Sequence, residues 1–172
     1  MAFDAYIQID GIPGEALDKN HKDWIEVLGY EYGATQATST TASSSGGASS
    51  QRVAVSDFTI RKVVDKASPK LFEACCAGVH IENVVLNVCR AGGDKQTYFS
   101  IELSKVLVSS FKTIAGGIQD GEDEAVGDLP VEQITFNFGS IITTYYQQNR
   151  QTGHIIGGTV GGWSREANSK AA

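Results

Sequence analysis

Hydrophobic and polar residues alternate with a period of two along several stretches of the chain. The clearest case is the start, where Phe3, Ala5, Ile7 and Ile9 are separated by mostly polar residues. This alternation predicts a β-strand with one buried face. The same pattern predicts further strands over residues 24–32, 53–64, 80–90, 98–108, 134–146 and 154–163.

The alternation changes phase inside some of these stretches. The change at Leu28–Gly29 predicts a bulge, and those at Ser104–Lys105 and Gly139–Ser140 predict bends in long strands. Long strands that bend suit a small barrel-like body, or two β-sheets that share strands. The tail after Arg165 shows no such pattern and is expected to fray.

One segment reads as a flanking α-helix. Ser68 is an N-cap candidate, Pro69 suits the first helical position, and Gly78 suits the position after the last turn. Leu71, Phe72 and Cys75 form the expected core-facing stripe. The predicted fold class is therefore mostly β with one helix.

Length and composition limit the alternatives. The 172 residues suit a single domain over 1–172, and 41% hydrophobic and 20% charged residues are ordinary for a globular chain. A net charge of −6 argues against nucleic acid as a partner. No apolar run approaches the ~20 residues of a membrane helix, and the N-terminus lacks the basic and apolar regions of a signal peptide.

Two stretches of unusual composition are expected to be loops. Residues 34–50 contain only Ala, Thr, Ser, Gly and one Gln, which predicts a flexible loop inside the domain. The acidic run 120–128 (DGEDEAVGD) fails the calcium-binding EF-hand pattern, because Ala125 replaces the required Gly and Val131 replaces the final Glu. A solvated acidic loop is the simpler interpretation.

Catalytic and metal-binding signatures are absent from the sequence. His21, His80 and His154 lie in no recognisable motif, and a loop histidine among charges such as His21 is usually solvated. A zinc site from Cys75, Cys76, His80 and Cys89 has the wrong spacing, so the cysteines are expected to be reduced, small and buried. We therefore expect no catalytic, cofactor-binding or metal-binding residues.

A series of short segments runs along nearly the whole chain. It starts at DGIPGE (10–15) and continues through Asp18 and His21 into KDWIEVL (22–28). Later segments follow in order: DKASPKL (65–71), CRAGG (89–93), PVE (130–132), FNF (136–138), TYYQQ (144–148) and the closing GG…GW (157–163). Taken together, this series resembles the Hcp family of type VI secretion.

The resemblance implies a structural role. It implies a barrel-like body of two β-sheets with one flanking helix, which forms a homohexameric ring with a wide channel. Stacked rings would form a tube that is propelled by a contractile sheath, capped by a VgrG-type spike and able to hold effectors in its lumen. The protein would lie in the bacterial cytoplasm before firing and would be secreted without a signal peptide.

Two other classes of function remain open on the residues alone. One is a monomeric β-barrel that binds a small ligand, and the other is a secreted enzyme or toxin that uses an acidic site. Only the ring-forming secretion protein predicts a six-fold particle, whereas the ligand-binding barrel and the enzyme or toxin predict a monomer or dimer.

Overall fold

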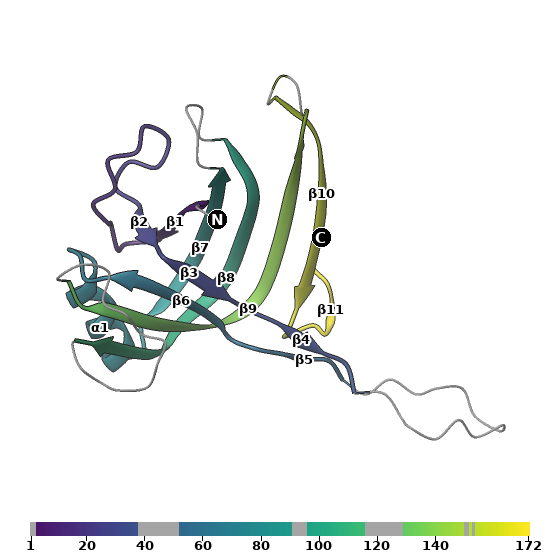
Figure 1. Cartoon of the computed structure of the whole chain (residues 1–172). Helices are drawn as coiled ribbons and strands as arrows, with labels where there is room; N and C mark the ends of the chain where they lie inside the picture. The colour runs from purple at the N-terminus through teal and green to yellow at the C-terminus, as the bar shows by residue number, and fades with distance from the viewer. Residues whose placement is uncertain (1–2, 38–51, 91–95, 116–128, 150–151, 153) are drawn as a thin grey trace.

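The computed structural model describes residues 3–37, 52–90, 96–115, 129–149, 152 and 154–172. Its strands form a curved sheet system with one helix at one end (Figure 1). Nine of the described strands belong to this system: β1 (Phe3–Ile9), β2 (Ile25–Val27), β3 (Gly29–Glu31), β6 (Phe58–Val63), β7 (His80–Arg90), β8 (Thr97–Ile114), β9 (Val131–Gln148), β10 (Ile155–Ser164) and β11 (Ser169–Lys170). The mostly β class with one flanking helix is confirmed.

Two long strands, β8 and β9, run through both halves of the body. They pair with each other from Phe99↔Tyr145 to Ile114↔Val131. The other edge of β9 pairs with two strands in turn. Its first part pairs with β6, through Phe58↔Phe136 to Val63↔Val131, and its second part pairs with β10, through Ser164↔Ser140 to Ile155↔Gln148. The two β-sheets therefore share strands, as the bends in the pattern predicted.

The bend lies where the sequence placed it. Lys105 has a positive φ of 54°, which is the left-handed region that few residues other than glycine adopt easily. Opposite it, a Cβ atom on Gly139 would lie 3.2 Å from the Lys105 Cβ, closer than two such atoms normally approach. Glycine at 139 thus leaves space for the side chains of Lys105 and Glu166.

The break at Leu28 transfers the chain from one sheet to the other. Before it, β2 pairs with β1 through Ile7↔Ile25, and after it β3 pairs with β6 through Tyr30↔Ile60. Between them the Leu28 amide donates to the Arg61 carbonyl oxygen at 2.8 Å. The body is barrel-like, although the sheets do not close into a barrel.

The hydrophobic core lies between these sheets, and the helix covers one end. Fully buried side chains come from every layer, including Ile7, Leu86, Ile101, Phe136 and Leu71. Burial of these apolar side chains is the main stabilising contribution in a fold of this kind.

The helix α1 (Ser68–Ala77) ends at Gly78, whose φ of 62° is left-handed, as predicted. Two other expectations for it are wrong. Ser68 is inside the helix rather than its N-cap, and the Asp65 carboxylate instead accepts a bond from the Ala67 amide at 2.9 Å. Phe72 is 57% exposed because the face toward the sheet is narrow and holds Ser68, Leu71 and Ala74.

Three predictions, for one strand, one loop and the C-terminal tail, also need correction. The 53–64 stretch divides into β5 (Ala54–Val55) and β6, and β5 pairs only with β4 (Ala34–Thr35) among the described strands. The expected 34–50 loop therefore begins with a strand, and residues 38–50 lie outside the described residues. The tail does not fray fully, because β11 pairs with β10 through Trp163↔Lys170.

Candidate functional site

The residues of the rejected zinc site, Cys75, Cys76, His80 and Cys89, do not form a metal site in the structure. Cys75 and Cys76 lie on α1, half-buried and exposed respectively, while Cys89 is buried in β7, with its Sγ 3.5 Å from the Thr97 Oγ1. Burial is confirmed for Cys89 and wrong for Cys76. Within the described residues, no three His, Cys, Asp or Glu side chains are placed to hold a metal ion. The acidic 120–128 run lies outside the described residues.

His21 is buried, which contradicts the expectation of a solvated loop histidine. Its Nδ1 lies 2.8 Å from the Asp18 Oδ1, and its Nε2 lies 3.2 Å from the Asn87 Nδ2. The ring stacks on Tyr6 with centroids 4.6 Å apart and meets the Trp24 ring edge-on at 4.9 Å. The imidazole thus fixes the segment between β1 and β2 against the sheet.

Lys62 forms a second buried polar cluster that sequence reasoning missed. Four oxygen acceptors surround the three N–H donors of its Nζ: the Glu132 Oε2 at 2.9 Å, the Asp65 Oδ1 at 2.8 Å, the Ser68 Oγ at 3.0 Å and the Val63 carbonyl oxygen at 2.9 Å. The Ser68 hydroxyl also donates to the Glu132 carboxylate at 2.7 Å. This cluster connects β6, β9 and the start of α1 and so holds the helix against the sheet.

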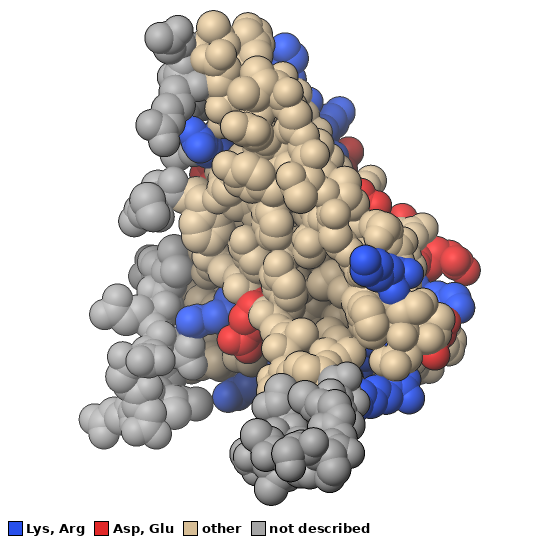
Figure 2. Space-filling view, turned by 90° about the vertical axis from the view of Figure 1, so that its right-hand side faces the viewer, with Lys and Arg blue, Asp and Glu red and all other residues tan. Residues whose placement is uncertain are grey.

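The exposed surfaces offer a clearer candidate for function than the buried clusters. β10 carries no charged residue, and its exposed apolar side chains include Ile155, Ile156 and Val160. Figure 2 views this side of the molecule and shows a broad area without charged side chains, bordered by lysines, arginines and acids. Among the described strands, the outer edge of β10 pairs only with β11, at Trp163 and Ser164. An apolar sheet edge of this length invites pairing with another chain.

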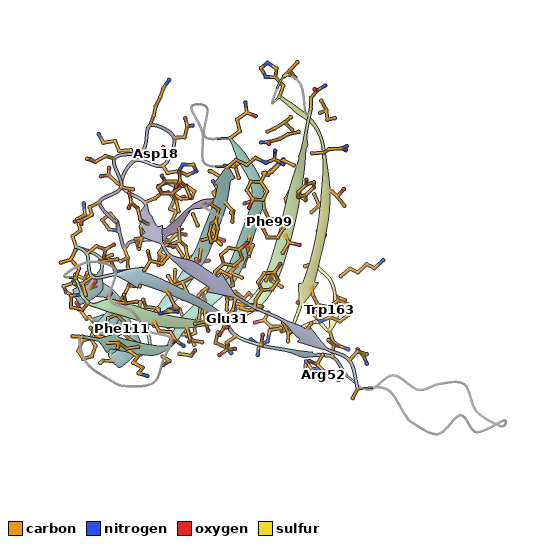
Figure 3. All side chains as sticks on the ribbon, in the orientation of Figure 1. Asp18, Glu31, Arg52, Phe99, Phe111 and Trp163 are labelled. Carbon is orange, nitrogen blue, oxygen red and sulfur yellow. The ribbon has the colours of Figure 1, made fainter. Side chains whose placement is uncertain are left out.

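A groove runs from this edge strand to the β4–β5 hairpin. Its volume is about 370 Å³, and aromatic and aliphatic side chains line it, among them Tyr32, Val53, Val55, Ile141 and Trp163. Figure 3 shows Trp163 near this end of the sheet and Glu31 on the strand that leads into the hairpin. Burial raises the pKa of the Tyr32 hydroxyl above its ordinary value, so this phenol stays neutral.

Two further grooves with charged rims lie at the ends of the β5–β6 segment. One has a volume of about 480 Å³ and includes Glu15, Leu17, Glu26, Leu28 and Leu129; we call it the acidic groove. The other has a volume of about 280 Å³ and is lined by Arg52, Val53, Val55, Trp163, Arg165 and Asn168; we call it the arginine groove. Apolar walls with charged rims are the ordinary composition of protein–protein contact surfaces.

The fold and these surfaces define a class: a mostly β protein with one helix and with exposed apolar and charged surfaces. Comparison with known proteins agrees. The sequence model of the family described as "Type VI secretion system effector, Hcp" matches residues 6–145. The chain is also 36% identical to protein hcp1 of Pseudomonas aeruginosa over 173 residues, which covers 99% of this chain and 100% of that protein.

Solved structures show the same relationship. One described as a type six secretion system protein superposes with a TM-score of 0.84 at 32% identity and covers 98% of this chain and 99% of its own. Hcp1 from Salmonella typhimurium gives a TM-score of 0.74 at 25% identity and covers 98% of this chain and 99% of its own. The chain therefore belongs to the Hcp family of type VI secretion proteins.

Proposed function

We propose that the chain is the subunit of a homohexameric ring that stacks into the type VI secretion tube. Membership of the Hcp family supplies the context, and the open apolar edge of β10 is the observation in this chain that carries the proposal. A strand with exposed Ile155, Ile156 and Val160 gains by pairing with a second copy, since pairing satisfies its free backbone groups and buries its side chains.

The further partners follow from that role. The tube would meet a VgrG-type spike at its tip and a contractile sheath around it, and effectors would travel in its lumen. The subunit would lie in the bacterial cytoplasm before firing and be secreted with the tube. No helix among the described residues is long and apolar enough to cross a membrane.

Native mass spectrometry and negative-stain imaging test the proposal. Six copies of the 18.3 kDa chain give a particle of about 110 kDa with six-fold symmetry. We expect Val160→Lys to abolish that particle, because a lysine on an edge strand opposes pairing with another chain. Val79→Lys is the matched control, since Val79 is also an exposed valine but lies outside β10. A wild-type monomer would refute the ring.

The groove beside the β4–β5 hairpin favours one alternative, a monomeric barrel that binds a small ligand. Its volume of about 370 Å³ and its apolar lining fall within the range of small-molecule sites. This alternative predicts a chain that stays monomeric at every concentration. The same mass measurement therefore decides between the two functions.

A further inference from the structure

The acidic groove and the arginine groove lie at opposite ends of one stretch of chain. Val53 and Val55 line the arginine groove, and Val63 and Val64 line the acidic groove. An extended chain rises about 3.3 Å per residue, so the stretch from Val53 to Val63 spans up to roughly 30 Å. Figure 1 shows this separation, since β5 and the far end of β6 lie at opposite sides of the body.

The acidic groove is an apolar surface with acids at its rim. Leu17 is 92% exposed, Leu129 is 55% exposed and Leu28 is 43% exposed. Glu15 and Glu26 are exposed beside them. Three exposed leucines around one concave surface are unusual on a chain that has no further contacts, and they mark an interaction surface.

The arginine groove has the complementary chemistry. Arg165 is held in place, because its Nη1 donates to the Asp57 Oδ1 at 3.0 Å and its guanidinium lies 5.0 Å from the centre of the Phe138 ring. Arg52 is exposed and donates to the main-chain carbonyl oxygen of Arg165 at 2.7 Å, which leaves its positive charge available. Figure 3 shows Arg52 at this end of the molecule, beside the hairpin.

We propose that the arginine groove of one copy docks into the acidic groove of the next. Arg52 would lie between Glu15 and Glu26, and Val53 and Val55 would cover the three leucines. Because the two surfaces differ and lie at opposite ends of the β5–β6 stretch, this contact is heterologous and repeats head to tail. The inference rests on the proposed function, since it assumes that copies of this chain assemble.

A carbodiimide cross-linking experiment tests the contact directly. The reagent joins an amine to a carboxylate that it touches, so the Arg52→Lys variant is used, which keeps the positive charge and supplies an amine. We expect an isopeptide bond from position 52 to Glu15 or Glu26, identified by mass spectrometry of the digested protein. Within one chain the two grooves lie at opposite ends of the β5–β6 stretch, so we expect the bond to join two copies. Mixing isotopically labelled and unlabelled protein confirms that it does.

Two controls make the result decisive. Lys105 and Glu166 form an ion pair of 2.6 Å within the chain, and their cross-link reports that the reagent has worked. Adding Glu15→Gln and Glu26→Gln to Arg52→Lys removes both acceptors and should lower the yield of the dimeric product by about tenfold or more. The added variants leave the Lys105–Glu166 product unchanged.

The inference is overturned if concentrated protein yields the Lys105–Glu166 product and no product from position 52 to Glu15 or Glu26. Such a result from a protein that still forms the hexameric particle would leave the proposed function intact. A protein that never forms that particle refutes the proposed function instead, whatever the cross-links show.

Discussion

Replacing Lys62 with methionine should destabilise the fold more than any other lysine substitution that the structure suggests. The Lys62 side chain is 0% exposed, and its ammonium contacts the Glu132 carboxylate at 2.9 Å. Methionine fills a similar volume but leaves the Glu132 charge buried, where the Ser68 hydroxyl still donates to it at 2.7 Å. Removing one partner of a buried ion pair costs about 3–5 kcal/mol, because the other charge stays buried without compensation.

The measurement is the free energy of unfolding in urea, taken at one protein concentration because assembly contributes to apparent stability. Lys105→Met is the matched control. Its ion pair with Glu166 is also short, at 2.6 Å, but the two side chains are 68% and 57% exposed. An exposed pair is screened by solvent and contributes little, so the control should lose little stability.

A double variant separates charge from packing. Lys62→Met combined with Glu132→Leu removes both charges, and replacing a whole buried pair with apolar side chains is often neutral or stabilising. We therefore expect the double variant to be more stable than Lys62→Met alone. The reasoning would be wrong if Lys62→Met cost no more than Lys105→Met, or if the double variant lost the sum of two large penalties.

Three further predictions concern other parts of the fold. His21→Ala should cost about 2–4 kcal/mol in urea unfolding, since it removes a buried ring and its polar contacts, whereas the exposed His80→Ala should change stability by about 0.5 kcal/mol or less. Phe72→Ala should cost about 1 kcal/mol, mainly its contact with another aromatic ring at 5.7 Å, while Leu71→Ala should cost about 2–5 kcal/mol; equal losses would contradict the burial. Burial raises the pKa of Tyr30 above its ordinary 10.0, and the charges of two neighbouring tyrosines raise it further. The contribution of the neutral Tyr30 hydroxyl to folding stability is therefore present below pH 10 and is lost as the pH rises above 10. Thermal unfolding of Tyr30→Phe should show a weaker alkaline decline in stability than wild type.

The strands and their bends could be predicted because they depend on local patterns. A change of phase requires the backbone to turn, and the turn at Lys105 and the glycine opposite it lie where the pattern changed. The helix end at Gly78 is equally local, since glycine adopts a left-handed φ without strain.

The buried polar groups could not be predicted in this way because their partners lie far along the chain. Lys62 follows Phe58 and Ile60 on the core-facing side of its strand. A charged side chain can be buried there because Glu132 lies directly opposite it in register. An acid and a base that both occupy core-facing positions are a usable signal only when the strand pairing is known. His21 is similar, since Tyr6 and Asn87 come from two different strands.

The exposed leucines could not be predicted for a different reason. Exposed leucines such as Leu17 and Leu28 look like ordinary core residues in a sequence, and only the structure shows that nothing among the described residues covers them fully. Glu15 and Glu26 are also eleven positions apart in a sequence whose acids are densest at 120–128, and only the fold brings these two to one groove.

The pairing of the first strand with a distant one sets the order in which the protein can fold during synthesis. β1 pairs with β7 from Phe3↔Arg90 to Ile9↔Val84, and β6 pairs with β9 from Phe58↔Phe136 to Val63↔Val131. A ribosome must therefore release most of the chain before either pairing can form, and contacts between such distant segments form slowly. Until then the apolar faces of β1 and β6 are open to other nascent chains. Rapid synthesis of this subunit in large numbers would place its greatest aggregation risk in this interval, before β9 has left the ribosome.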